Sequence, residues 1–325
     1  MHHPHAYHPV VLDAGMADDI AGQFGLGADA RLSGGPVARG KQGRIWRLDT
    51  ETGRWAVKEP FWRTAEADVG AAADFQRAAR DAGVPTPRVV RAQGGALLAD
   101  VGGTQVRVYE WVDLLPPDIT LDPVAVGRAV AAVHLVRMEP TAPVDPWYSE
   151  PIGADHWDEL VGLLRRAGAP FAHRLAAARD ELVALEDWIE PPENLQSCHR
   201  DLWADNLLPT ATGGVCVIDW EDSGLADPSQ ELGCVLFEFA GDDPARARAL
   251  YASYLGHGGP GRMERPGHFS MLIAQLGHIG EIACRDWLEP NPRSPDRGDS
   301  AAWFAEFVDR PHDRHVLETI LAAIR

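Results

Sequence analysis

Residues 197–222 read SCHRDLWADNLLPTATGGVCVIDWED. Two short runs of β-favouring residues, 207–210 and 215–218, flank an Ala-Thr-Gly-Gly sequence at 211–214. This is a good turn sequence because glycine accepts positive φ angles without steric cost. We therefore predict that the two runs pair as a β-hairpin, whose register decides which polar side chains meet.

The predicted register brings oxygen-bearing side chains to the open end of this hairpin. If Thr210 faces Val215, then Asn206 faces Asp219, and directly opposed residues of an antiparallel pair lie roughly 5 Å apart. Asp201 lies just upstream, on the loop that enters the hairpin. An amide oxygen and two carboxylates suit Mg²⁺, which takes oxygen ligands and usually shares its shell with phosphates. The alternative is that these residues only cap a loop and a turn.

The order of these residues also resembles a known pattern. His199-Arg200-Asp201, followed by Asn206 and then by a strand ending in Asp219, resembles the catalytic loop and metal-binding aspartate of the protein-kinase-like fold. The continuation I-D-W-E-D…A-D-P…E-L-G is similar to the small-molecule branch, the aminoglycoside phosphotransferase and choline kinase superfamily.

The resemblance extends over residues 30–290 and implies an α+β fold with two lobes. Residues 1–112 would form a small nucleotide-binding lobe, made of an antiparallel sheet and one main helix and ending in the hinge. Residues 113–325 would form a larger, mostly helical lobe with the catalytic loop and the substrate site.

The resemblance also implies a role for each matching residue. Asp201 would accept or orient the proton of the attacking hydroxyl, and Asn206 and Asp219 would hold Mg²⁺. The nucleotide-binding residues would be a lysine and its acidic partner, a glycine-flanked hairpin over the phosphates and the hinge backbone at the adenine: Lys58, Glu66, Gly40, Gly43, Glu110 and Val112.

Lys58 stands out on its own sequence context. Residues 44–49 and 54–59 alternate as two strands joined by a turn at 50–53, and Lys58 lies inside the second, after Ala-Val. A buried ammonium needs a partner, whereas a lysine on the exposed face of an edge strand does not. The helix predicted at 64–82 offers Glu66, Asp68 and Asp74 as partners. We choose Glu66 for its longer reach, although the sequence does not settle the choice.

Two departures from the kinase pattern bear on the substrate. Residue 200 is arginine, as in protein kinases, where small-molecule members often have glycine. Asp219 is followed by Trp220-Glu221, and no long activation segment precedes Asp227. A protein substrate would need a platform there, so a small molecule is favoured. Glu221 and Asp222 are candidates for binding metal or a cationic substrate, or are simply solvated.

The C-terminal half is predicted to be mostly helical, with Asp227 capping a helix that begins at Pro228. Helices are expected at residues 122–138, 155–167, 171–189, 228–240, 244–256, 264–288 and 312–324, with a loop at 289–298. Acidic residues and tryptophans of this half could line a site for a cationic substrate, although solvated or core positions are the ordinary reading: Glu238, Glu281, Asp286, Glu289, Trp147, Trp287 and Trp303.

Composition excludes some classes of partner. The 325 residues carry a formal net charge of −18, which disfavours nucleic acid and anionic membranes because both require basic patches. No apolar run is long enough for a transmembrane helix, and the N-terminus lacks the features of a secretory signal. The four cysteines show no C-x-x-C pairing. We therefore expect a cytoplasmic protein with reduced, buried thiols and no obligate protein partner.

The resemblance implies an ATP-dependent or GTP-dependent kinase that transfers the γ-phosphoryl group to a hydroxyl of a small molecule. An aminoglycoside or similar cationic antibiotic is the favoured substrate. Choline, an amino alcohol, a sugar or a hydroxy amino acid is the alternative within the same class. A nucleotide-binding pseudokinase without turnover is a further alternative, which the complete set Lys58, Asp201, Asn206 and Asp219 disfavours. A metal hydrolase lacks a second histidine ligand at useful spacing.

Overall fold

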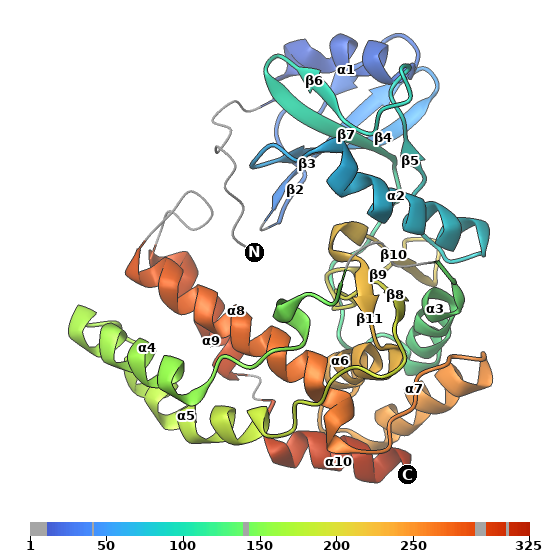
Figure 1. The fold of residues 1–325 in the computed structure, drawn as a ribbon. Coiled ribbons are helices and arrows are strands. Elements are labelled where there is room, and N and C mark those ends of the chain that lie inside the picture. Colours follow the sequence, from blue (N-terminus) through green and yellow to red (C-terminus); the bar gives the residue numbers. More distant parts are fainter. Residues whose placement is uncertain (1–11, 41, 139–142, 290–296, 310–311) are drawn as a thin grey trace. The chain divides into compact units, whose positions relative to one another are not determined.

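The computed structural model describes residues 12–40, 42–138, 143–289, 297–309 and 312–325. The chain divides into two compact units, residues 1–115 with 210–221 and residues 116–209 with 222–325, whose elements are labelled in Figure 1. The lobe boundary predicted after Val112 stays a prediction, and no single cut could place 210–221 with the first unit. Lys41 and the N-terminal histidines lie outside the described residues.

An antiparallel sheet forms the centre of the first unit. Its strands run in the order β1-β3-β4-β7-β5, with β2 paired to β3 and β6 paired to β7. The predicted strands at 44–49 and 54–59 are β3 and β4, each slightly longer than expected. The bounds are β1 Arg31–Leu32, β2 Ala38–Arg39, β3 Gly43–Thr50, β4 Gly53–Pro60, β5 Val89–Val90, β6 Ala99–Val101, β7 Thr104–Glu110 and β10 Val215–Val217, with helices η1 Ala14–Met16, α1 Ala17–Phe24 and α2 Glu66–Asp81.

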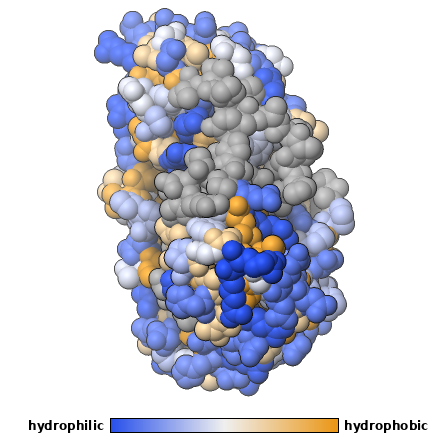
Figure 2. Space-filling view, turned by 90° about the vertical axis from the view of Figure 1, so that its left-hand side faces the viewer, coloured by the Kyte–Doolittle hydropathy of each residue, from blue (hydrophilic) through white to orange (hydrophobic). Residues whose placement is uncertain are grey.

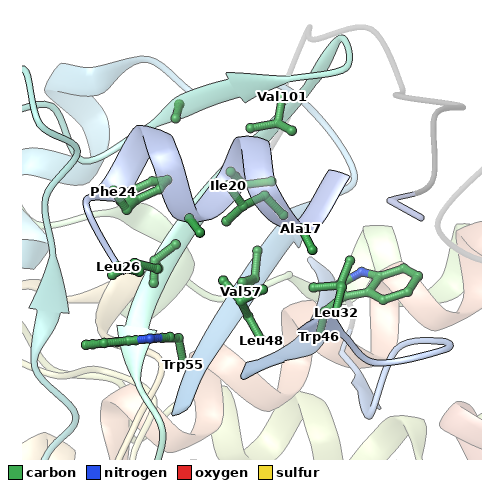
Figure 3. Packing of buried hydrophobic residues seen from close by; sticks show 14 of the residues in the cluster. Ala17, Ile20, Phe24, Leu26, Leu32, Trp46, Leu48, Trp55, Val57 and Val101 are labelled. Atoms are coloured by element: carbon green, nitrogen blue, oxygen red, sulfur yellow. The ribbon is translucent and has the colours of Figure 1, made fainter. Parts of the chain in front are cut away.

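The two faces of this sheet have different roles, because successive side chains of a strand point to opposite sides. Val57 of β4 and Val106 and Val108 of β7 join the hydrophobic core beneath α1. Figure 3 shows Ile20 and Phe24 of α1 lying over this face. Lys58 and Arg107, the residues in between, therefore lie on the other face, which is the α2 side of the sheet.

The second unit is mostly helical. Its bounds are α3 Pro123–Leu135, η2 Pro146–Tyr148, α4 Ala154–Ala167, α5 Ala172–Glu186, α6 Pro228–Ala240, α7 Pro244–Gly256, η4 Pro266–Phe269, α8 Ser270–Leu288, α9 Arg297–Asp309 and α10 Arg314–Ile324. It also contains β8 Gln196–Cys198 and β11 Gly224–Ala226, which pair antiparallel, and β9 Leu207–Pro209. The short helix η3 Trp220–Asp222 spans the boundary at residue 221.

Helix α6 forms the core of the second unit, and all of its residues are buried. It begins as predicted: the Asp227 side chain accepts a hydrogen bond from the Ser229 N–H, and Pro228 occupies the first turn. Asp227 also accepts from the N–H groups of Glu193 and Asn194. The side chain of Gln230, in the first turn of the helix, donates to the Glu190 carbonyl. The cap therefore fixes both the helix and the chain that leads to β8.

The surface and the thiols agree with the composition. On the face shown in Figure 2, hydrophilic residues predominate among the coloured ones and hydrophobic areas are small. Across the described residues, every helix is too short or too polar to cross a membrane. The four cysteines are free and buried, as predicted.

Candidate active site

The catalytic-loop residues come together in the second unit. The Asn206 side-chain amide donates hydrogen bonds to the Asp201 carboxylate at 2.6 Å and to the Asp201 carbonyl at 3.0 Å. The other carboxylate oxygen of Asp201 lies 3.5 Å from Nε2 of Gln275 on α8. Two side chains therefore fix the Asp201 carboxylate, and Asn206 lies directly against it.

The loop holds its shape through a buried glutamate of α6 that the sequence analysis did not single out. Arg200 has a φ of 66°, a left-handed conformation that costs an ordinary L-residue free energy. Its backbone N–H donates to the Glu231 carboxylate. Because Glu231 lies on the central helix of the unit, the strained residue beside Asp201 is tied to the rigid core.

Glu231 is itself held by a chain of hydrogen bonds. The Tyr254 hydroxyl accepts from the Gly261 N–H at 2.8 Å and lies 2.8 Å from Nδ1 of His134. A neutral His134 satisfies both contacts when Nδ1 accepts from the Tyr254 hydroxyl and Nε2 donates to Glu231 over 2.7 Å. Burial opposes ionisation of Glu231, but its contacts with His134 and Arg200 outweigh burial and lower its pKa. The buried carboxylate is thus anionic and fully engaged.

The side chain of Arg200 also anchors the segment after the metal-binding position. Its Nε donates to the Asp222 carbonyl at 2.6 Å, and its guanidinium carbon lies 4.3 Å from the ring centroid of Tyr148. A Cβ on Gly224 would approach that guanidinium carbon to 2.6 Å. Glycine at 224 therefore leaves the space that the buried arginine occupies.

In the first unit, Lys58 and Asp219 are in direct contact, which the sequence analysis did not predict. The Lys58 ammonium donates to Asp219 at 2.9 Å and to Glu221 at 2.5 Å. Burial disfavours the charged ammonium, but the two carboxylates outweigh that effect and raise the pKa of Lys58. Lys58 is therefore a buried cation with two counterions, and it does not lie on the exposed face of an edge strand.

A second cation lies directly beside Lys58. Arg107 of β7 is the cross-strand partner of Lys58 on β4, and its guanidinium lies 2.7 Å from the Glu221 carboxylate. Directly opposed like charges destabilise a sheet, so Glu221 neutralises a pair that would otherwise repel. Burial alone would raise the pKa of Glu221, but Lys58 and Arg107 outweigh burial and lower that pKa below its ordinary value. Arg107 lies between two valines of a strand, and this alternation Val106-Arg107-Val108 was the sequence pattern that could have identified it as a candidate site residue.

The chain carrying Asp219 is attached to the first unit by its own contacts. The Val217 N–H donates to the Pro85 carbonyl at 2.8 Å, and Trp220 Nε1 donates to Thr86. The Trp220 ring meets Phe75 of α2 edge-on, with centroids 5.2 Å apart. These contacts surround Asp219, whose φ of 57° is unusual for a residue other than glycine.

The chosen partner of Lys58 is wrong. Glu66 is the first residue of α2, and its carboxylate accepts from the backbone N–H groups of Leu97 and Leu98. Its position at the helix start directs it to this loop, while Asp219 and Glu221 occupy the Lys58 ammonium. A nucleotide-binding role for Glu66 therefore has no support in these contacts.

The remaining nucleotide-binding predictions stay predictions. The Gly40 N–H donates to the Gly43 carbonyl at 3.0 Å. A Cβ on Gly43 would meet the Glu59 carbonyl at 2.5 Å, so close packing against β4 already requires glycine there. Glu110 ends β7, and its N–H donates to the Arg88 carbonyl. The Val112 carbonyl accepts from the Leu114 N–H.

The strands and the turn of the predicted metal-binding hairpin are present as β9, β10 and residues between them. Gly213 and Gly214 have φ angles of 89° and 86°. Asn206 and Asp219 belong to different units, so their predicted juxtaposition stays a prediction. The donor chemistry fits Mg²⁺: the Asn206 amide nitrogen is used on Asp201, which leaves the amide oxygen for a cation, and one Asp219 oxygen faces Lys58.

One other group of described residues has metal-ligand spacing. His134, Cys198 and Glu231 place one ligand atom each within 4.8 Å of one another. However, both ring nitrogens of His134 are used in the chain described above, and Cys198 donates to the Ala226 carbonyl. Hydrogen bonding accounts for this cluster, and His134 is a buried core residue.

Comparison with known families agrees with this geometry. A profile of the phosphotransferase enzyme family matches residues 34–265. The chain belongs to this phosphotransferase enzyme family. The family assignment confirms the resemblance and the predicted enzyme class, a phosphotransferase with a hydroxyl group as acceptor. Comparison of this phosphotransferase with curated protein sequences gives no significant match.

The phosphotransferase is similar to several solved structures. Spectinomycin phosphotransferase in complex with ADP and spectinomycin has 16% identity, a TM-score of 0.69 and coverage of 97% of this chain and 99% of that one. A choline/ethanolamine kinase family protein from Mesorhizobium loti has 19% identity, a TM-score of 0.54 and coverage of 95% and 99%. A microcompartment-associated aminopropanol kinase has 18% identity, a TM-score of 0.57 and coverage of 95% of this chain and 99% of that one. At these identities the likeness concerns the fold, and it confirms the predicted α+β, protein-kinase-like class.

Proposed function

We propose that this phosphotransferase transfers the γ-phosphoryl group of ATP to a hydroxyl of a small, amine-bearing molecule, with an aminoglycoside or similar cationic antibiotic as the favoured substrate. The observation that carries the proposal is the fixed pair of Asp201 and Asn206, with Asn206 2.6 Å from the carboxylate. In phosphoryl transfer by kinase-like folds, a catalytic base and a metal ligand lie close together on one loop, as Asp201 and Asn206 do here.

Each residue has a role in this reaction. Asp201 orients the acceptor hydroxyl and takes its proton, while Gln275 and Asn206 keep the carboxylate in place. Lys58 binds the α- and β-phosphates in place of one of its present carboxylate contacts. Asn206 and Asp219 hold Mg²⁺, which when bound neutralises charge on the phosphates.

An amine on the substrate is supported by two observations. The similar structures include proteins named for spectinomycin, choline or ethanolamine, and aminopropanol, and the chain is strongly acidic. The predicted acidic residues differ in availability. Glu238 accepts from the Ala204 N–H of the catalytic loop, Glu281 is bound by His156 and Arg285, and Glu289 is exposed. Glu281 thus offers a carboxylate that is already neutralised.

A quaternary or simple amino alcohol is the second candidate. Trp147 stacks on His278 of α8, with centroids 5.0 Å apart, and His278 follows Gln275 by one helical turn. Aromatic faces attract ammonium groups, so this pair offers a surface near Asp201 for such a cation. Trp287 instead packs edge-on against Phe171 in the core. A sugar or hydroxy amino acid is a further alternative.

The test is the release of ADP or GDP by purified protein with Mg²⁺, ATP or GTP, and a panel of acceptors. The panel contains aminoglycosides, spectinomycin, choline, amino alcohols, sugars and hydroxy amino acids. Asp201→Asn should lower turnover at least about a hundredfold, the usual scale of general base catalysis. The matched control is Asp242→Asn, which changes an exposed carboxylate beyond α6.

The outcomes separate the hypotheses. Turnover on one acceptor class, lost in Asp201→Asn and retained in Asp242→Asn, supports the proposal and identifies the substrate. Equal turnover in both variants would refute the role of Asp201. Nucleotide binding without turnover on any acceptor would favour a pseudokinase. Antibiotic resistance and a cytoplasmic location are parts of the proposal that expression in a susceptible bacterium, with cell fractionation, would test.

A further inference from the structure

Helix α2 has no acidic side chain directed at Lys58 among its described residues. Its four acidic residues are Glu66, Asp68, Asp74 and Asp81. Glu66 binds the loop at Leu97 and Leu98, and Asp74 pairs with Arg77 and Arg91. Asp68 and Asp81 are exposed. The acidic position on this helix that protein kinases use for their lysine is therefore not used here.

The side of α2 that lies against the sheet carries uncharged residues. Val69, Ala72 and Gln76 line a small cavity together with Arg107 and Glu221. The negative charge at this place thus comes from the chain after Asp219, and the helix contributes apolar and amide surface. This reverses the usual assignment of which element supplies the counterion.

We propose that Glu221, held by Arg107, is the positioning residue for Lys58 in nucleotide binding. The proposal rests on the nucleotide role of Lys58 under Proposed function. Glu221 contacts both cations, at 2.5 Å from the Lys58 ammonium and 2.7 Å from the Arg107 guanidinium. With Arg107 fixed on β7, Glu221 holds the flexible lysine side chain in one direction.

The two counterions of Lys58 differ in a way that assigns them different tasks. The Asp219 side chain is 37% exposed, whereas that of Glu221 is 17% exposed. Asp219 has a single lysine contact and can exchange it for a metal ion. Glu221 bridges two directly opposed cations on β4 and β7, so its departure would leave them facing each other. Glu221 therefore stays with Lys58 when nucleotide binds.

The experiment measures the Kd of Mg²⁺-free ADP by calorimetry for the full chain and its variants. Lys58→Met defines the loss caused by removing the lysine. Glu221→Gln and Arg107→Met should each weaken ADP binding about tenfold or more, approaching Lys58→Met. The double variant Glu221→Gln/Arg107→Met should bind ADP no more weakly than either single variant, because both changes break the same set of contacts among Lys58, Glu221 and Arg107. This double variant also removes both charges of the pair, which limits any effect on folding.

The matched control is Glu59→Gln. Glu59 is the next residue of β4, is 1% exposed and also pairs with an arginine, Arg44, but it accepts from Trp46 on the core side. It should leave the Kd of ADP unchanged. An equal loss in this variant would mean that any buried glutamate of the strand matters, and it would overturn the proposal.

Three other results are decisive. If Lys58→Met binds ADP normally, the nucleotide role of Lys58 fails and with it this part of the proposed function. If Lys58→Met loses binding but Glu221→Gln does not, or binds more tightly, only the present inference is overturned. If Glu221→Gln raises the Mg²⁺ concentration needed for ATP binding while Arg107→Met does not, Glu221 is a metal ligand and its positioning role is refuted.

Discussion

Arg200 allows a quantitative test of how the catalytic loop is held. We consider Arg200→Gly, Gly224→Ala and their combination. Arg200 is 9% exposed at a φ of 66°, and its guanidinium occupies the space where a Cβ of residue 224 would lie. The two substitutions therefore act on the same space from opposite sides.

The magnitudes follow from the contacts. Arg200→Gly loses a charged hydrogen bond to the Asp222 carbonyl, about 1.5–3 kcal/mol, and the Tyr148 ring contact, about 1–2 kcal/mol. Glycine tolerates the left-handed backbone, which stabilises the variant by about 1–2 kcal/mol. The greater flexibility of glycine in the unfolded chain offsets about 0.5–1 kcal/mol of this gain. We expect a net decrease of about 2–4 kcal/mol in the free energy of unfolding.

Gly224→Ala should cost a similar amount in the wild type, because its Cβ expels the guanidinium. In the Arg200→Gly background it should cost less than about 0.5 kcal/mol, the scale of a substitution with no special contact. Urea unfolding followed by circular dichroism measures all four proteins. A double variant whose loss equals the sum of the single losses would refute the reasoning, because it would show that the two residues do not share one space.

Three further predictions concern buried groups of the second unit and the thiols. Burial lowers the pKa of His312 to about 4, whereas the ordinary pKa of about 6.5 applies in the unfolded chain. Between these two pH values only the unfolded chain takes up a proton at this residue, so the free energy of unfolding should fall by about 3 kcal/mol from pH 6.5 to pH 4. Unfolding measured across this pH range should no longer show this contribution in His312→Phe. Glu231→Gln should lower the free energy of unfolding by about 3 kcal/mol and Tyr254→Phe by about 1 kcal/mol. A larger loss in Tyr254→Phe than in Glu231→Gln, measured by urea unfolding, would contradict the assigned chain of hydrogen bonds. Burial raises the pKa of the Cys216 and Cys284 thiols to about 12, so a chromogenic disulfide at pH 8 should titrate the cysteines only after denaturation; rapid reaction of the native protein would show that they are accessible.

Local signals in the sequence were sufficient for two helices and one turn near the candidate site, but not for the short strands β8 and β11. Helices α6 and α7 were predicted with their observed bounds, and the Asp227-Pro228 cap was the signal for α6. The structure shows the same combination of a capping carboxylate and a first-turn proline at Asp243-Pro244. The turn at Gly213 and Gly214 was equally clear. Helix α9 was missed, since its start at Arg297 lies within the stretch interpreted as a loop and no capping pattern marked it.

The partner of Lys58 could not be found by the same means. Glu221 is 163 residues away in the sequence, and neither hydrophobic periodicity nor capping reports such a contact. The pairing of Lys58 with Arg107 depends on the register of β4 and β7, which the sequence analysis did not assign. Reliance on the kinase pattern then favoured a helix glutamate. Contacts between distant segments were thus beyond the reach of local patterns, even where each segment was correctly predicted.

The first unit is formed by two separate segments of the chain, 1–115 and 210–221, and this limits how the gene can be divided. Its sheet comes from residues before 116, but the two carboxylates that neutralise Lys58, those of Asp219 and Glu221, come from 210–221. A fragment ending at Leu115 would therefore keep Lys58 and Arg107 and lose both of their counterions. Such a fragment would have to hydrate or deprotonate cations that the intact chain buries. Domain swaps between relatives should accordingly transfer 210–221 together with the N-terminal segment, because a junction at residue 115 alone would separate Lys58 and Arg107 from their counterions.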